Sequence, residues 1–375
     1  MFTSPSHLKL INDWEKVNEN VEIIVAVDIG GSGLRIRISN LHNETQFLDL
    51  GHVRAQTTEE TITVFRNLGQ SLKEVIPSFV SKAGALAVAG PISNGKVVLT
   101  NWIGPPSDRT LVLDELPEVI FPKGKTLFLN DLEAGAYGII AAQHLGELAS
   151  HFTQLWSFGS NSQSQPLIAN RTAVLAMGSG LGAAIILHTP LIPDPIVMPT
   201  ELGHIQISVA CDHDPNHQIE HDLIQHVSNH YHAGKQAPEY EDIASGRGLS
   251  LTYQYFMIKR QGKTIPVENI NAGDVAQSAK EGDPVAREAL KWHYLIFMRA
   301  AKTIATSLSC ETILLALDNQ VKNAWFVQAI ADELKDEFNN FIRPDWVKGI
   351  RVYAQTETLN FNILGTTYMA KQLCK

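Results

Sequence analysis

Two glycine-rich turns, each placed between two apolar strands, have the composition of loops that bind phosphate. The first is Asp28-Ile-Gly-Gly-Ser-Gly33 and the second is Gly178-Ser-Gly-Leu-Gly182. Glycine has no side chain, so the backbone N–H groups of such turns can reach phosphate oxygens. The sequence therefore predicts phosphate contacts at both turns. The residues expected to make these contacts are Gly30, Gly31, Ser32, Gly33, Gly178, Ser179 and Gly180.

Two common phosphate loops do not match this chain. Gly124-Lys125-Thr126 and Gly262-Lys263-Thr264 have the last letters of a P-loop, but Val119 and Met257 stand where its first glycine is required. The dinucleotide fingerprint also fails, because the first turn has the wrong glycine spacing and leads into a strand instead of a helix. What remains is a tight hairpin that holds a hydroxyl and a cation beside phosphates.

Asp28 indicates which kind of phosphate ligand the first turn would bind. A carboxylate repels a bare diphosphate, whereas it attracts a metal-bound triphosphate. We therefore expect Asp28 to bind Mg²⁺ directly or through water, beside a metal-bound triphosphate. The alternative is a structural aspartate of the turn. Arg35 and Arg37 alternate along the following strand, so Arg35 is either the cation beside the phosphates or a solvated side chain.

The elements around the first turn alternate between strands and helices. Val21 to Val27 and Leu34 to Ile38 predict a hairpin, because the second run alternates apolar and polar residues. Apolar residues at helical spacing predict a helix over Thr57 to Ile76. Further strands are expected over Gly84 to Ile92, Lys96 to Trp102 and Lys125 to Leu129, followed by a helix over Leu132 to Ala142.

The strand, turn and strand pattern occurs a second time. Ala173 to Met177 and Ala183 to His188 flank the second turn, and Gly31-Ser-Gly-Leu34 is identical to Gly178-Ser-Gly-Leu181. One unit is therefore expected to be used twice. The remaining predicted elements are helices over Pro284 to Leu308 and Lys322 to Ile342, strands over Thr312 to Leu317 and Ile350 to Ala354, and an exposed polar loop over Ser157 to Pro166.

This alternation predicts an α/β protein with two similar domains that face one another across a cleft. The expected domains are a small one over residues 21–131, to which residues 357–375 return, and a large one over residues 132–356. A cleft is the common place for a ligand.

Composition excludes several classes of protein. The chain has 375 residues, 44% of them hydrophobic, with 26 Gly and 17 Pro, which excludes a disordered or collagen-like chain. A net charge of −9 without a long basic run gives no support for a nucleic-acid partner. Cys211, Cys310 and Cys374 are too few and too scattered for a disulfide framework.

Localisation follows from what the sequence lacks. Met1 to Glu15 has no apolar core of a secretory signal. Ala173 to Leu187 is the longest apolar run, and it is shorter than the roughly 20 residues that cross a bilayer. The expectation is a cytoplasmic protein with no membrane partner.

The motifs resemble those of the bacterial-type glucokinases, in the same order along the chain. Asp28-Ile-Gly-Gly-Ser-Gly-Leu-Arg35 and Gly178-Ser-Gly-Leu-Gly182 are similar to the two phosphate motifs of the sugar kinase, actin and Hsp70 superfamily. The resemblance covers roughly residues 23 to 251 and implies two ribonuclease-H-like (actin-like ATPase) domains around a central cleft. The blocks similar to the family's sugar motifs are Ala89-Gly-Pro-Ile92, Leu99-Thr-Asn-Trp102, Leu129-Asn-Asp-Leu-Glu-Ala134, Pro199-Thr-Glu-Leu-Gly-His204 and Glu241-Asp-Ile-Ala-Ser-Gly-Arg-Gly-Leu249.

This resemblance implies a glucokinase that uses ATP and Mg²⁺ to phosphorylate the 6-hydroxyl of glucose. Phosphoryl transfer to a hydroxyl needs a base for its proton. Asp131 follows a buried-looking strand, so its carboxylate is expected at a sheet edge, and the resemblance gives it the role of that base. It also implies that Asp131 and five further residues contact the sugar. These are Asn101, Asn130, Glu201, His204 and Glu241.

The sequence also allows other interpretations. Asn130-Asp131 is also a common helix N-cap. The enzyme could act on another hexose or amino sugar, and a non-catalytic sugar-binding regulator with an actin-like fold is a different class. In favour of the regulator, the altered Asp318-Asn319 segment, within Leu315-Ala-Leu-Asp-Asn-Gln320, stands where glucokinases usually carry two glycines. The late glycine motif, which reads Asn362-Ile-Leu-Gly365, also departs from the family. Against it stand Asn130-Asp131 and both turns. Ser32 and Ser179 keep the hydroxyl of the family's Thr.

A histidine-rich segment offers a further candidate for a metal site. His213, His217 and His221 are spaced four apart, which is a metal-like pattern if the segment is helical. Pro215 interrupts the segment, so a polar, solvated stretch is the preferred interpretation.

Homodimers are frequent in the resembled family, so a second copy of the chain is a candidate partner.

Overall fold

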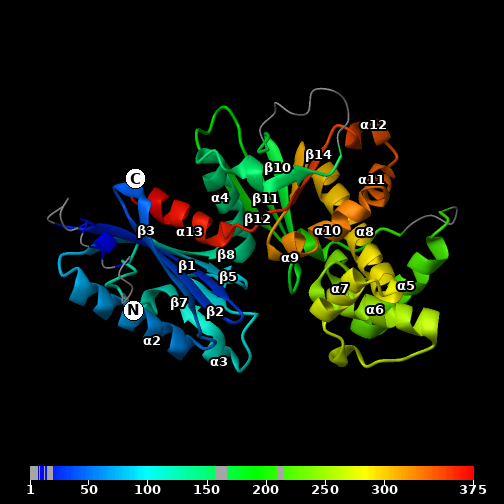
Figure 1. The fold of residues 1–375 in the computed structure, drawn as a ribbon, viewed down its shortest axis with the longest axis horizontal. Helices are drawn as coiled ribbons and strands as arrows, with labels where there is room; N and C mark the ends of the chain where they lie inside the picture. The colour runs from blue at the N-terminus through cyan, green and yellow to red at the C-terminus, as the bar shows by residue number, and fades with distance from the viewer. Residues whose placement is uncertain (1–6, 8, 12, 15–19, 157–166, 210–213) are drawn as a thin grey trace. The chain divides into compact units, whose positions relative to one another are not determined.

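The computed structural model describes residues 7, 9–11, 13–14, 20–156, 167–209 and 214–375 (Figure 1). The chain forms two compact units, Met1–Gly146 with Asn360–Lys375 and Glu147–Leu359. We call them the first and the second unit. The polar loop expected over Ser157 to Pro166 lies outside the described residues.

The first unit contains a five-stranded sheet of order β3-β2-β1-β4-β8. β1 and β2 pair antiparallel with Gly30 opposite Gly33, which confirms the predicted hairpin. β4 and β8 run parallel to β1, as strands joined by crossover connections do. The strands are β1 (Glu22–Gly30), β2 (Gly33–Asn40), β3 (Asn43–Val53), β4 (Val80–Val88) and β8 (Thr126–Asn130).

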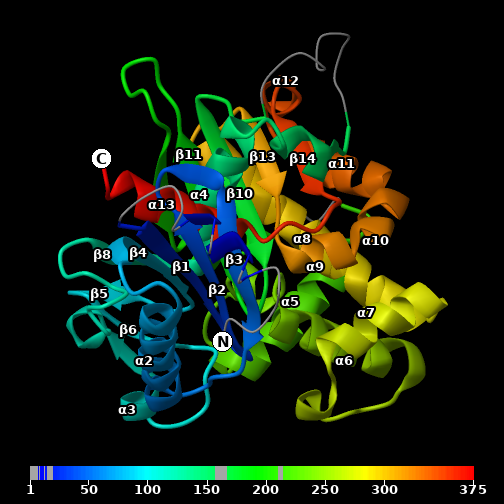
Figure 2. The ribbon, with the colours of Figure 1, turned by 60° about the vertical axis from the view of Figure 1, so that its left-hand side comes forward.

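Helices cover both faces of this sheet (Figure 2). α2 (Thr58–Val75) buries Phe65 and Leu68 against the face of β1 that carries Val25. α13 (Phe361–Gln372) packs on the opposite face, where Ala370 meets Ile24. Successive residues of a strand point to opposite faces, so the almost entirely apolar β1 needs a helix on each side.

The last helix of the chain packs against α4 (Asp131–His144). A Cβ atom on Gly138 of α4 would overlap the carbonyl oxygen of Phe361, and one on Gly365 of α13 would overlap that of Ala134. The late glycine is thus required by close helix packing. Because α4 packs in this way, the first unit extends to Gly146, beyond the boundary after residue 131 that the sequence predicts.

A small three-stranded sheet lies within the first unit. It consists of β5 (Ile92–Ser93), β6 (Lys96–Val98) and β7 (Thr110–Val112), and a short helix, α3 (Pro106–Arg109), precedes β7. The strand predicted over Lys96 to Trp102 therefore ends at Val98. Beyond Val98 the chain leaves the strand, and the backbone N–H of Thr100 donates a hydrogen bond to the carbonyl oxygen of Ala89.

The second unit contains a six-stranded sheet of order β12-β11-β10-β13-β14-β9. The five strands from β12 to β14 in this order repeat the topology of the first unit. Three of them form an antiparallel meander, β12-β11-β10, and β13 and β14 continue the sheet parallel to β10. The duplicated unit and the α/β class with two ribonuclease-H-like domains are therefore confirmed. The strands are β9 (Phe152–Gln154), β10 (Arg171–Met177), β11 (Leu181–Leu187), β12 (Ile196–Thr200), β13 (Thr312–Leu315) and β14 (Arg351–Gln355).

Three helices of the second unit pack against α8 (Pro284–Ser307), the long helix that the sequence predicts at this position. Most residues of α8 are buried, so it forms the centre of this core. The three helices that pack against it are α6 (Gly246–Gln261), α7 (Ala272–Glu281) and α11 (Ala331–Asn339). The other helices are α5 (His217–His232), α9 (Asp318–Lys322), α10 (Ala324–Ala329) and α12 (Pro344–Val347).

The single helix predicted over Lys322 to Ile342 is wrong. Asn323 and Ile330 have non-helical backbone angles and separate α9, α10 and α11. Asn competes for backbone hydrogen bonds, and a β-branched Ile has a low helix propensity. The apolar spacing continues through the breaks, with Phe326, Leu334 and Phe338 all buried, so periodicity alone does not reveal them.

Within the described part of the chain, no helix combines the length and the apolar character that crossing a bilayer requires.

Candidate active site

The first glycine turn closes the β1–β2 hairpin. Gly33 has a φ of +148°, and a Cβ atom there would overlap the carbonyl oxygen of Val53, so this position requires glycine. A Cβ atom on Gly31 would lie 3.2 Å from the backbone oxygen of Asn101. Asn101 therefore packs directly against the turn. The hydroxyl of Ser32 hydrogen-bonds the Nε2 atom of His52 at 3.1 Å, a contact that the sequence did not predict.

Asp28 is buried just before this turn, with 6% of its surface exposed. Arg35, its cross-strand partner, donates to Oδ2 at 3.1 Å. Two asparagines from the end of the chain complete its surroundings: the amide of Asn360 donates to Oδ2 at 3.4 Å and that of Asn362 to Oδ1 at 3.1 Å. The sequence motifs did not predict either asparagine, because more than 300 positions separate them from Asp28.

Asp131 lies at the same sheet edge as the first glycine turn. The parallel register places Ile29 of β1 beside Val88 of β4, and Val88 beside Asn130 of β8. Asn130-Asp131 and the turn after Ile29 therefore leave the sheet at the same carboxyl end, separated by β4, and ligands bind at this end in open α/β sheets.

Asn130 is also the N-cap of α4, as the alternative interpretation required. Its Oδ1 accepts the N–H of Leu132 at 3.0 Å, and Glu133 accepts the backbone N–H of Asn130 at 3.3 Å. Burial raises the pKa of the Glu133 carboxyl. Asp131 accepts the N–H of Leu132 through Oδ1 at 2.9 Å. The cap fixes where α4 begins and so holds Asp131 at the first turn of the helix.

The second glycine turn joins β10 and β11 and meets Glu241. The N–H of Gly178 donates to the carbonyl oxygen of Gly180 at 2.8 Å, which closes the turn. Glu241 lies so close that a Cβ atom on Gly180 would be 2.5 Å from its Oε2. The same oxygen accepts the N–H of Leu181 at 2.9 Å, and Arg247 donates to Oε1 at 2.9 Å.

Glu201 and His204 lie at η4 (Leu202–His204), a 3-10 turn that packs on β11. A Cβ atom on Gly203 would overlap the carbonyl oxygen of Leu181, so the turn can approach β11 only with glycine at this position. The Glu201 side chain is 82% exposed and its Oε2 lies 3.8 Å from Nε2 of His204. Glu201, His204 and Glu241 are thus gathered around the start of β11.

His204 has a second carboxylate partner that the motifs did not include. Its Nδ1 donates to Oε2 of Glu239 at 2.6 Å. The hydrogen bond to Glu239, aided by the charges of Glu241 and Glu201, raises the pKa of the His204 imidazole.

The segment after β13 departs from a glycine pair but keeps glycine-like backbone geometry. Leu317 has φ 73° and ψ 175°, a region that residues other than glycine rarely occupy. Its N–H donates to Oε1 of Gln355 at 2.7 Å, and the amide of Asn319 donates to the carbonyl oxygen of Met177 at 2.9 Å. The segment therefore lies beside the second glycine turn.

The histidine-rich segment does not assemble a recognisable metal centre in the described residues, which contain no group of three or more His, Cys, Asp or Glu suited to one. His217 and His221 lie on α5, whereas His213 and Cys211 lie outside the described residues.

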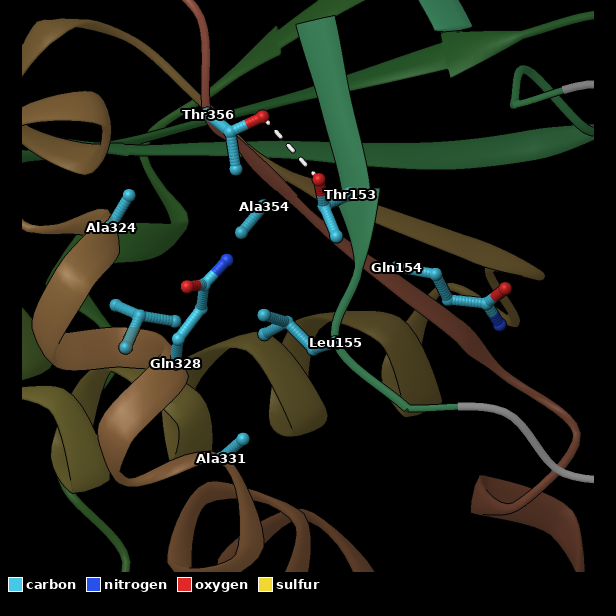
Figure 3. A pocket seen from close by; sticks show the side chains of 9 residues that line it. Thr153, Gln154, Leu155, Ala324, Gln328, Ala331, Ala354 and Thr356 are labelled. Carbon is cyan, nitrogen blue, oxygen red and sulfur yellow. Dashed lines mark hydrogen bonds between the residues drawn. The ribbon is translucent and has the colours of Figure 1, made fainter. Parts of the chain in front are cut away.

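A cavity of about 260 Å³ opens in the second unit beside β14 and α10. Thr153 and Thr356 point toward one another on its wall, 3.4 Å apart, and Gln328 faces them (Figure 3). Its nine lining residues include none of the site residues predicted from the sequence and no charged side chain. This cavity therefore offers no cation to a phosphate group.

Comparison with known proteins identifies the family. The family model described as Glucokinase matches residues 25–315. The chain is 54% identical over 366 residues to Probable glucokinase 2 of Trichomonas vaginalis, covering 97% of this chain and 96% of the relative. It is 52% identical over 364 residues to Glucokinase 1 of the same organism, with the same coverage.

A comparison with solved structures supports the same family. The glucokinase of Balamuthia mandrillaris in complex with glucose superimposes with a TM-score of 0.87 at 31% identity, covering 98% of this chain and 99% of that one. The resemblance that the motifs indicated is confirmed, and with it the fold: the chain belongs to the glucokinase family.

Proposed function

We propose that this protein is an ATP-dependent glucokinase, which transfers the γ-phosphoryl group of ATP to the 6-hydroxyl of glucose and releases glucose 6-phosphate and ADP. The observation that carries the proposal is the position of Asp131 at the same sheet edge as the Gly30 to Gly33 turn. A candidate base and a candidate phosphate turn are thereby held at the same edge of one sheet, by β8 and β1, with β4 between them.

In this proposal Asp131 accepts the proton of the 6-hydroxyl group of glucose, while the oxygen of that hydroxyl forms a bond to the γ-phosphorus of ATP. The bond from that phosphorus to the β-phosphate oxygen breaks, and ADP leaves with the electron pair. Amides can donate to and accept from hydroxyls, carboxylates accept from them, and a protonated imidazole donates. The sugar ligands in this proposal are Asn101, Asn130, Glu201, His204 and Glu241.

The surroundings of Asp28 fit a Mg²⁺ ion that keeps most of its water. Mg²⁺ in nucleotide sites is held by one or two carboxylates together with substrate phosphates. Asp28 supplies one carboxylate, and the buried Oδ1 of Asn362 has no hydrogen-bond partner, so it can accept from a metal-bound water. Mg²⁺ bound here would neutralise charge on the polyphosphate. Arg35, now paired with Asp28, is half-exposed and can also reach phosphate.

A coupled assay that crosses hexoses and amino sugars with ATP, ADP, polyphosphate and pyrophosphate, with and without Mg²⁺, tests the proposal. We expect product from glucose and ATP only when Mg²⁺ is present. Faster turnover of another sugar would identify the alternative kinase. Binding of glucose without turnover under any condition would identify a sugar-binding regulator and contradict the proposal.

A further inference from the structure

Glu239 and His204 are brought together by backbone, not by chance contact of two surface side chains. The N–H of Tyr240 donates to the carbonyl oxygen of Ile205 at 2.9 Å, and that of Ile207 donates to Pro238 at 2.9 Å. Residues 205–207 and 238–240 therefore run side by side, with Gln206 bridged to Glu239.

Glu239 itself is anchored at its own backbone. It is the N-cap of η5 (Tyr240–Asp242) in a capping box with Asp242, which accepts the N–H of Glu239 at 3.0 Å. Asp242 is buried and also bonds Nε2 of His232 at 2.7 Å. The Glu239 side chain is only 35% exposed. An anchored carboxylate loses little conformational entropy when it binds a neighbour, so this contact is worth more than an ordinary surface ion pair.

The charges around His204 favour a cationic ring. Glu239 bonds Nδ1, Glu201 lies 3.8 Å from Nε2, and Glu241 is the third carboxylate that acts on the ring. Glu241 is itself paired with a cation, Arg247, which also lies 3.4 Å from Asp242.

We infer that Glu239 is a positioning residue for glucose: by holding Nδ1 of His204, it turns Nε2 toward Glu201 and presents it as a hydrogen-bond donor to a sugar hydroxyl. The inference rests on the proposed function. Carboxylates such as Glu201 can only accept from hydroxyls, so a protonated imidazole beside them supplies the donor that a hydroxyl oxygen needs. A ring whose Nδ1 is held by a carboxylate keeps that orientation in both protonation states.

Glu239→Gln tests this role, with the exposed Glu268→Gln of η6 (Val267–Asn269) as the matched control. Glutamine keeps the size of the side chain but removes the charge. We expect the KM for glucose to rise about tenfold, the scale of one charge-assisted hydrogen bond, while kcat changes less than about twofold. The glucose KM should also begin to rise at a lower pH than in the wild type, because the His204 imidazole loses its proton more readily. Glu268→Gln should behave like the wild type.

NMR titration of the imidazole resonances supplies a readout that does not depend on turnover. The His204 signal is assigned from its loss in His204→Asn. We expect Glu239→Gln to lower the pKa of His204 and Glu239→Asp, which keeps the carboxylate, to leave it raised. An unchanged pKa in Glu239→Gln, or a fall in kcat as large as the rise in KM, would overturn the inference. If the wild type neither binds nor phosphorylates glucose, the proposed function fails instead, and the titration then shows only whether Glu239 controls His204.

Discussion

Glu241 accepts the backbone N–H of Leu181 through the carboxylate oxygen that also lies against Gly180. A residue expected to bind sugar is thus fastened to the turn expected to bind phosphate. Because the turn fixes this oxygen and Arg247 holds the other, the Glu241 carboxylate has little freedom to move. Any change in the turn therefore acts on the sugar ligand as well.

Gly180→Ala should weaken glucose binding. The new Cβ atom would lie 2.5 Å from Oε2 of Glu241, so the carboxylate must leave the N–H of Leu181. We expect the dissociation constant for glucose, measured by calorimetry, to rise about tenfold, equivalent to one hydrogen bond to a charged group. Gly178→Ala is the comparison, because a Cβ atom there meets nothing within 4 Å and does not reach Glu241. Equal glucose affinity in both variants would contradict this coupling.

Leu317 should prefer glycine to alanine. At φ 73° and ψ 175° a Cβ atom is strained, whereas glycine adopts this conformation readily. Both variants remove the leucine side chain, so the difference between them isolates the backbone. Leu317→Gly should be more stable than Leu317→Ala by about 1 kcal/mol in urea unfolding, the reverse of the order in ordinary helices and strands. A more stable alanine variant would show that the backbone is not strained here.

His293 should make folding stability depend on pH. Burial lowers its pKa from 6.5 to about 4, and its Nδ1 donates to the carbonyl oxygen of Ile243 at 2.8 Å. Between these two values the unfolded chain binds a proton that the folded chain does not, so stability is complete above about pH 6.5 and falls with decreasing pH.

The loss attributable to His293 can reach about 1.4 kcal/mol per pH unit within that window. The measurement is the free energy of unfolding at pH 7 and pH 5 for the wild type and for His293→Asn. The wild type should lose more stability between the two than the variant does, and equal losses would rule out this histidine as the cause.

Glu220→Gln should destabilise the second unit strongly. Glu220 and Arg299 form a bidentate ion pair with distances of 2.6 and 2.9 Å, and their side chains are 2% and 8% exposed. Removing one charge leaves the buried guanidinium undercompensated, at a cost of about 3 kcal/mol. Asp345→Asn, which breaks the exposed pair with Lys348, should cost less than about 0.5 kcal/mol in the same denaturation experiment. Similar costs for the two variants would refute the role of burial.

The sequence predicted those parts of the site in which strand, turn and strand follow one another directly. The hairpin around Gly30 to Gly33 and the placement of Asp131 after a buried strand required only local patterns. The sequence did not predict the edge strand β3, because apolar and polar residues alternate only weakly along it and one of its sides carries polar groups.

Long-range partners could not be predicted in this way. Asn362 reaches Asp28, and Glu239 reaches His204, only because strands and helices bring together segments that are far apart along the chain. No periodicity marks such a pair. The motif from Glu241 to Leu249 is recognisable in the sequence. Glu239, two residues earlier, belongs to no motif, and only the structure shows its hydrogen bond to His204.

The kinetics and glucose affinity of Asp131→Asn test the central claim most directly. Asparagine keeps the size of the side chain and can still accept from Leu132, but it cannot take a proton from the 6-hydroxyl. We predict that kcat with glucose and MgATP falls by about 10² to 10⁴ while calorimetry shows glucose bound within about threefold of wild-type affinity. Turnover close to that of the wild type would contradict the assignment of Asp131 as the general base.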